Sequence, residues 1–137
     1  MRVVGFNFNK INIEKFSDKL EKMNIKTNID ISNIQSIDNN LLKTNNSLIA
    51  VNFIYTVDYD PNFAKIVLSG TILFELDEKQ SKEILKSWKE KQIPENFKLT
   101  LFNTILRKSN VKALQLEDDL NLPLHISLPT LRKPEKD

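Results

Sequence analysis

The spacing of apolar residues changes near the middle of this sequence, from every second residue to every third or fourth. Apolar side chains alternate at 49–59 and again, through Gly70, at 66–76, which is the period of a strand with one buried face. From residue 78 onward they recur at helical spacing. A run of strands followed by helices predicts an α+β fold with an antiparallel sheet.

Two strands are expected ahead of that pair. The alternation at 4–13 changes parity near Lys10, which predicts a bulge or bend in one long strand. A second alternation, at 25–31, predicts a half-buried strand that frays around 34–37. The segment 14–24 fits either a short helix or a charged hairpin connection.

The strands at 49–59 and 66–76 are joined by the turn "DYDPN", in which Pro61 has no amide hydrogen to donate. They are therefore expected to form an antiparallel hairpin. The stretch "DNNLLKTNNS" before them is a turn-rich connector.

Two helices are expected in the second half. Asp77 is a candidate N-cap with Gln80 three residues later, and the dipeptide Ile93-Pro94 stops this helix. The second helix starts after Pro94, and Asn110 marks a candidate internal break. Its expected buried residues are Phe97, Leu101, Phe102, Ile105, Leu106, Ala113, Leu116 and Leu120. The prediction is a single domain over 1–137, a four-stranded antiparallel sheet with both helices on one face, in which 132–137 form a flexible tail.

Composition excludes several kinds of site. The sequence has no cysteine, one histidine and two glycines, which excludes disulfides, thiolate metal sites and paired-histidine sites and disfavours a glycine-rich phosphate loop. The sequence places no serine or carboxylate beside His125 to form a triad. Glu117, Asp118 and Asp119 are expected either to be exposed or to follow an earlier helix end, because negative charge is unfavourable at a helix C-terminus. We therefore expect no enzyme activity, no cofactor and no metal.

The sequence also bears on location. It has no apolar run of about 18 residues that could span a bilayer. Asn7 interrupts the apolar stretch after Arg2, so no signal peptide is expected. These features predict a cytoplasmic protein.

Positive charge is concentrated on the expected helices. Residues 79–112 hold nine Lys and Arg and three Glu, a local net charge of +6 in a chain whose total is +2. Such a surface could contact the phosphates of RNA, but an ordinary solvated helix face is the simpler interpretation. The candidate nucleic-acid-binding residues are Lys79, Lys82, Lys86, Lys89, Arg107 and Lys108.

Two apolar features lack an assigned partner. Trp88 lies on the apolar face of the first expected helix and fits either the core or a partner interface. The stretch "LNLPLHISLPTLRKP", residues 120–134, holds large aliphatic side chains that prolines keep out of a helix. These side chains either strap the last helix to the sheet or line a binding groove.

The order of strands and helices, the hairpin "SLIAVNFIYTVDYDPNFAKIVLSGTILFEL" and the segment "NLPLHISLP" together resemble SecB, a tetrameric export chaperone. "VGFNFNKINIEK" and "NVKALQLEDDLNLPLHISLP" are also similar to small uncharacterised archaeal proteins. The resemblance implies a homo-oligomer, dimer or tetramer, with apolar grooves that hold unfolded or partner polypeptides without a cofactor. It links the chain to protein transport.

We therefore expect a non-enzymatic holdase, with an RNA- or ribosome-associated factor as the alternative. The expected polypeptide-binding residues are Phe53, Tyr55, Trp88, Leu122, Leu124, Ile126, Leu128 and Leu131.

Overall fold

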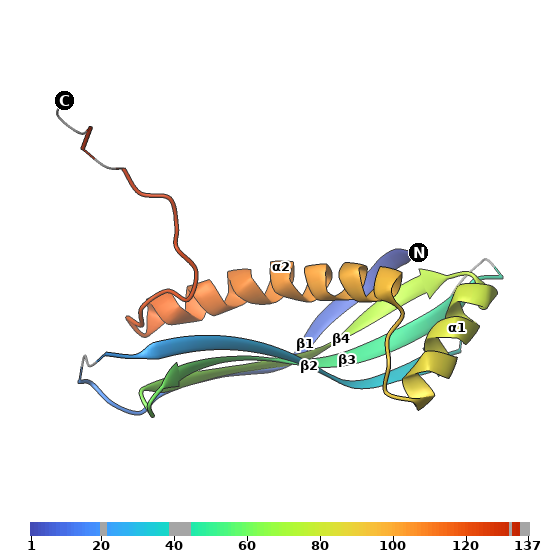
Figure 1. Cartoon of the computed structure of the whole chain (residues 1–137), viewed down its shortest axis with the longest axis horizontal. Helices are drawn as coiled ribbons and strands as arrows, with labels where there is room; N and C mark the ends of the chain where they lie inside the picture. Colours follow the sequence, from blue (N-terminus) through green and yellow to red (C-terminus); the bar gives the residue numbers. More distant parts are fainter. Residues whose placement is uncertain (20–21, 39–44, 132, 135–137) are drawn as a thin grey trace.

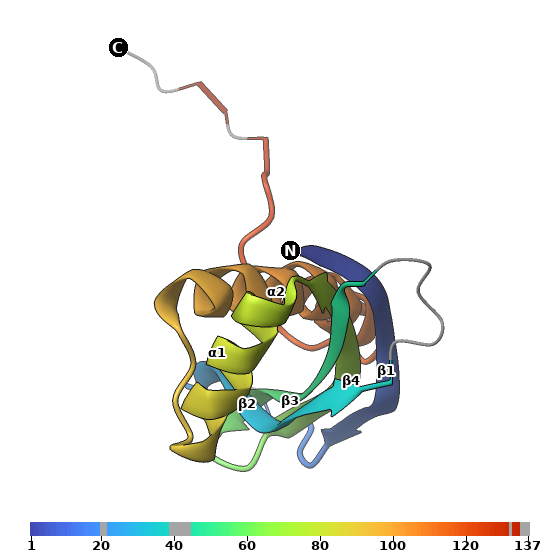
Figure 2. The same cartoon turned by 90° about the vertical axis from the view of Figure 1, so that its right-hand side faces the viewer.

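The computed structural model describes residues 1–19, 22–38, 45–131 and 133–134. Its elements are β1 (Arg2–Lys15), β2 (Asn24–Ile37), β3 (Ser47–Asp60), β4 (Ala64–Leu76), α1 (Glu78–Lys89) and α2 (Glu95–Asp119). The strands form one antiparallel sheet in the order β1-β4-β3-β2. Both helices cover the same face of this sheet (Figure 1, Figure 2). The predicted α+β fold is confirmed.

The core lies between the two central strands and the helices. Alternate residues of β3 and β4 face the helices, and each of the following is at most 1% exposed: Ile49, Val51, Phe53, Tyr55, Val57, Tyr59, Ile66, Leu68, Ile72 and Phe74. On the opposite face, Asn9 donates a hydrogen bond to Thr71, and Thr71 donates one to Asn52, each at 2.9 Å. The alternation predicted which residues share a face, and the helices show which face is buried.

The strands are longer and more regular than their apolar patterns suggest. The pairing of β1 with β4 shifts register between Phe8 and Lys10, so the predicted bulge is confirmed. The predicted fraying at 34–37 is wrong, because these residues continue the ladder opposite the first residues of β3, and Ile34 is buried. In the connection between β1 and β2, residues 16–19 and 22–23 are not helical. Much of the connector before β3, 39–44, lies outside the described residues.

The first helix starts at the predicted cap, but it ends before it reaches the predicted stop, and Lys91 already has a left-handed φ of 57°. The Gln80 N–H donates to Asp77 Oδ1 at 2.7 Å, which is the N-cap hydrogen bond that stabilises the first turn. Helix α1 ends at Lys89, ahead of the Ile93-Pro94 dipeptide.

The second helix is continuous through Asn110, so the expected break is wrong. Its fully buried residues fall at every fourth position: Phe97, Leu101, Ile105, Ser109, Ala113 and Glu117. Four residues advance a helix by roughly 40° beyond one full turn, so this row winds gradually around α2 as the helix crosses a twisted sheet. The shift in the apolar stripe therefore reflects the path of the helix and not an interruption. Phe102, Leu106, Leu116 and Leu120 are partly buried beside the row.

Within the described residues, neither helix is long and apolar enough to span a bilayer. Of the expected flexible tail at 132–137, all but Lys133 and Pro134 lie outside the described residues.

Candidate functional site

A cleft of about 620 Å³ opens between β2 and the two helices. β2 is an edge strand, paired only with β3 in the sheet. The residues that line the cleft are Ile29, Asp30, Ile31, Trp88, Lys91, Gln92, Ile93, Lys98 and Phe102. They come from β2, from the end of α1 and from the start of α2, so the sheet edge and the turn between the helices together form the cleft.

The cleft has a mixed lining, in which Asp30, Lys91, Gln92 and Lys98 are polar and the other residues are apolar. Its apolar lining residues are Ile29 and Ile31 of β2, Trp88 of α1, Ile93 between the helices and Phe102 of α2. Lys91 Nζ lies 4.5 Å from the centroid of the Trp88 ring, and Lys98 Nζ lies 5.9 Å from that of Phe102. Each ammonium group is attracted to an aromatic face while it stays hydrated.

Only some of the predicted polypeptide-binding residues are accessible. Trp88 is half-buried and lines the cleft, so it serves the core and the cleft together. Phe53 and Tyr55 are 1% and 0% exposed beneath α2, and in this fold neither can contact a second chain. Leu122 is buried as well. The exposed members are Leu124, Ile126, Leu128 and Leu131.

The other lining residues were not predicted as binding residues. Ile29 and Ile31 belong to a cleanly alternating strand, and Phe102 belongs to the apolar stripe of α2. Their sequence pattern identifies a buried face, but it does not show that β2 lies at the sheet edge. No local signal could have selected them.

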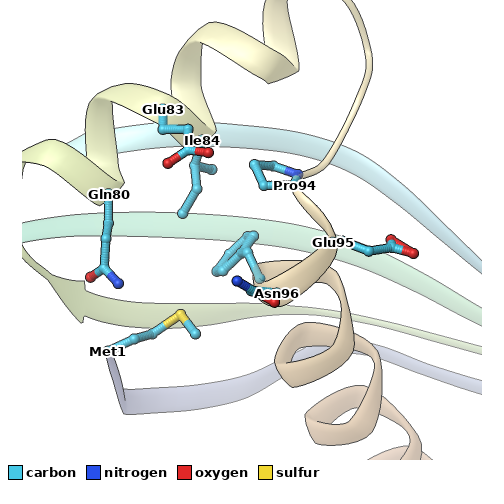
Figure 3. Close-up of a pocket in the computed structure, with 8 residues that line it drawn as sticks. Met1, Gln80, Glu83, Ile84, Pro94, Glu95 and Asn96 are labelled. Atoms are coloured by element: carbon cyan, nitrogen blue, oxygen red, sulfur yellow. The ribbon is translucent and has the colours of Figure 1, made fainter.

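A second, smaller pocket of about 210 Å³ lies between α1 and the start of α2. Figure 3 shows the Met1 side chain reaching toward it from the start of β1. Its lining residues are Met1, Gln80, Glu83, Ile84, Pro94, Glu95, Asn96 and Phe97. The cleft beside β2 has about three times this volume, and it is the candidate site.

A buried polar network lies next to the cleft, under the segment that follows α2. Glu117 is 0% exposed. It accepts a hydrogen bond from the His125 backbone N–H at 3.0 Å, and its Oε2 lies 2.6 Å from His125 Nδ1. Two of our expectations are therefore wrong. Glu117 is not exposed although α2 continues to Asp119, and His125 has a carboxylate partner eight positions earlier in the sequence.

The other side of the imidazole faces β3 and α2. His125 Nε2 lies 2.9 Å from Tyr55 Oη and 3.2 Å from Asn110 Oδ1. Tyr55 donates to Asn110 Oδ1 at 2.6 Å, and Tyr59 donates to the Pro123 carbonyl oxygen, also at 2.6 Å. The network thus ties the first residues after α2 to the sheet.

Both tyrosines act as neutral donors in this network. Burial raises the pKa of Tyr55 and of Tyr59, and the nearby charge of Glu117 raises both pKa values further. A phenol with a raised pKa is a poor general base near neutral pH. Because the imidazole and carboxylate are also enclosed, at 3% and 0% side-chain exposure, the network fits a structural role better than catalysis.

The candidate nucleic-acid-binding residues are exposed but lie on two helices. Four lysines are on α1, and Arg107 and Lys108 are on α2. Lys82 already forms an ion pair with Glu78 at 3.1 Å, and Lys108 Nζ lies 5.8 Å from the centroid of the Phe6 ring. RNA binding stays a prediction. Among the described residues, no three His, Asp or Glu side chains gather as a metal site would require.

Comparisons with known proteins identify the fold. No protein-family model matches the sequence, and no curated protein matches it. A solved structure does match: the Mycobacterium tuberculosis Rv1957 SecB-like chaperone in complex with a ChAD peptide from the Rv1956 HigA1 antitoxin. The TM-score is 0.58 at 10% sequence identity, with 98% of this chain and 92% of that chain covered. The fold is SecB-like.

The SecB-like fold extends over nearly the whole chain, from β1 to beyond α2. It therefore includes both the cleft and the network. The expected similarity to small archaeal proteins stays a prediction.

Proposed function

We propose that this chain is a non-enzymatic, cytoplasmic holdase that binds unfolded or partner polypeptides in the cleft beside β2. The observation that carries the proposal is the composition of that cleft. Ile29 and Ile31 of an edge strand line, together with Trp88 and Phe102, a cleft of about 620 Å³.

This arrangement suits polypeptides of many sequences. A peptide can add to an exposed sheet edge through main-chain hydrogen bonds while alternate side chains enter an adjacent apolar cleft. Apolar burial is non-directional, so the cleft can accept side chains of different shapes. The solved SecB-like chaperone, whose structure includes a bound peptide, supports this proposal through its fold.

The sole tryptophan of the chain lies in the cleft and gives a direct test. We expect a synthetic extended peptide of alternating Leu and Ser to change the fluorescence of Trp88. We also expect the protein to suppress light scattering by an aggregating unfolded client at stoichiometric amounts. Absence of both effects would rule out the holdase.

Salt dependence separates this function from RNA binding. Peptide binding by apolar contacts should persist as salt rises, whereas lysine–phosphate contacts weaken steeply. Titration of a fluorescent single-stranded RNA in 50 and 200 mM salt supplies the comparison. Tight, salt-sensitive RNA binding without peptide binding would favour the alternative.

A matched pair of variants on α2 locates the site. Phe102→Ser removes an aromatic lining residue, whereas Val111→Ser changes a residue of the same helix that is 56% exposed and not part of the cleft lining. We expect only Phe102→Ser to weaken peptide binding, by about tenfold or more, since a lost buried aromatic contact costs at least 1–2 kcal/mol. Urea unfolding of both variants shows whether the fold is retained.

A further inference from the structure

The segment that follows α2 turns back along the helix. Asn121 adopts a left-handed conformation with φ 55°, and the Leu122 N–H donates to the Glu117 carbonyl oxygen at 2.8 Å. A left-handed asparagine just after the last turn is a common way to terminate a helix and redirect the chain. The next residues therefore run back toward the middle of α2.

Two tyrosines of β3 mark the direction of this path. Tyr59 Oη donates to the Pro123 carbonyl oxygen, and Tyr55 Oη lies 2.9 Å from His125 Nε2. Tyr55, which the path reaches second, pairs with Ile29 of β2. Because Ile29 lines the cleft, residue 125 lies level, along the strands, with one end of the cleft.

The residues that follow are numerous enough to enter the cleft. An extended chain advances about 3.3 Å per residue. Ile29 and Ile31 are neighbouring inward-facing residues of β2, two positions apart. Two extended residues beyond His125 therefore cover the distance from the level of Ile29 to that of Ile31. Asn110, which lies beside His125, is about 12 Å along the helix axis from Phe102. Residues 126–131 span roughly 20 Å when extended.

Those residues have the chemistry that the cleft accommodates. Ile126, Leu128 and Leu131 are 37%, 52% and 104% exposed, although they are large and apolar. In Figure 1 the segment after α2 first turns back along the helix and then rises away from the body of the protein. Large apolar side chains gain free energy when they leave water, and the isoleucine and aromatic side chains of the cleft offer them apolar surface.

We infer that residues 126–131 form a strap that closes over the cleft of their own chain, with the network around His125 as its fixed hinge. The described arrangement is the open state. The strap competes with bound polypeptide for Ile29, Ile31, Trp88 and Phe102. This competition rests on the proposed function, whereas the closure of the strap does not.

Closure can be trapped by a disulfide, because the chain has no native cysteine. We expect the double variant Leu128→Cys with Ile31→Cys to form an intramolecular disulfide under mild oxidation. The control is Leu128→Cys with Lys26→Cys, since Lys26 is an exposed residue of β2 that pairs with Asp58 on the opposite face of the sheet. The inference is overturned if the Ile31 pair stays reduced, if it cross-links no faster than the control, or if its disulfides join two chains.

Competition is tested with a labelled peptide of the sequence LHISLPTL, which matches residues 124–131. We compare its binding to the full chain and to a chain that ends at His125. If the strap is closed nine-tenths of the time, removing it should tighten binding about tenfold, because only open molecules bind. Equal affinities overturn the strap and leave the holdase in place. If the truncated chain does not bind the peptide either, the holdase fails, and the disulfide experiment alone decides whether the strap closes.

Discussion

Glu117 and His125 depend on each other at a buried position. A buried carboxylate without a partner is costly, and loss of one member of a buried pair leaves the other uncompensated. The contact also joins two elements, because Glu117 belongs to α2 and His125 to the segment that leaves it. One pair of side chains therefore fixes where the chain lies after the last helix.

We expect His125→Ala to lower the free energy of unfolding by about 3–5 kcal/mol, the usual cost of breaking a buried pair. Urea denaturation at neutral pH measures this loss. Asp118→Asn changes the exposed neighbour of Glu117 and should alter stability by less than about 0.5 kcal/mol. Equal stability of the His125 variant and the parent would show that the contact does not hold the segment.

The two buried tyrosines predict a loss of stability at alkaline pH. Burial and the Glu117 charge raise the pKa of Tyr55 and Tyr59 above the ordinary value of 10.0. Above pH 10 the unfolded chain loses phenol protons that the folded chain keeps, so the free energy of unfolding falls as pH rises. The slope is on the order of 1 kcal/mol per pH unit for each tyrosine. Urea denaturation from pH 8 to 11 should show a shallower decline for Tyr55→Phe; an unchanged slope would contradict this account.

Ser109 and Asn110 are adjacent on α2 but differ in their hydrogen bonds. Within the described residues, the buried Ser109 hydroxyl has no hydrogen-bond partner, whereas Asn110 accepts from Tyr55. We expect Ser109→Ala to stabilise the protein by about 1 kcal/mol, because alanine removes an unsatisfied polar group and favours helix. Asn110→Ala should destabilise it by a similar amount. Thermal unfolding compares the two variants, and a less stable Ser109→Ala would contradict the first expectation.

At Gly70, β4 approaches both of its neighbouring strands closely. Gly70 of β4 faces Phe8 of β1 on one side and Phe53 of β3 on the other. A Cβ at Gly70 would collide with the Asn7 backbone oxygen and lie 3.0 Å from two atoms of the Phe53 ring. The alternation of β4 continues through this position only because glycine leaves room for that ring.

We expect Gly70→Ala to lower the free energy of unfolding by about 1–3 kcal/mol, the range for overpacking a filled core. Gly5→Ala is the control. A Cβ at Gly5 would lie 3.2 Å from its nearest neighbour, Leu73 Cδ1, which belongs to a flexible side chain. Urea denaturation of both variants provides the comparison. If Gly5→Ala lowers the free energy of unfolding as much as Gly70→Ala does, the loss comes from replacing a strand glycine in general and not from the close contact at Gly70.

The whole molecule leaves apolar surface on both edges of its sheet. At the β1 edge, Val3, Val4 and Ile11 are 39%, 39% and 48% exposed, and β1 pairs only with β4 in the sheet. An edge strand with apolar side chains is a template for pairing with another chain. We propose that two or four copies associate, with the β1 edge as one contact.

Light scattering should therefore give a mass of twice or four times 15.9 kDa. We expect Ile11→Lys to lower that mass by placing a charge at the edge. Lys10→Glu, a change at a neighbouring polar position, should keep the assembled mass. A parent that stays at 15.9 kDa at micromolar concentration contradicts the proposal.

Features set by neighbours in the sequence could be predicted. The alternation of β3 and β4, the bulge near Lys10 and the cap at Asp77 each depend on residues a few positions apart, because strand period and helix capping are local. The order of elements and the segment after α2 also pointed correctly to the SecB-like fold. The sequence by itself therefore determined the order of the strands and helices and the fold class, although not the full length of β2 or the continuity of α2.

The tertiary structure alone decided which of these residues line the cleft and which are enclosed. Tyr55 was expected to line a binding groove, but it is buried beneath α2. Glu117 was expected to be exposed or to follow the end of the helix, but it is buried within α2 and pairs with His125. The cleft joins Ile31 to Trp88 and Phe102, residues distant in the sequence. Burial, edge position and long-range partners depend on how the sheet twists beneath the helices. No local pattern encodes that arrangement.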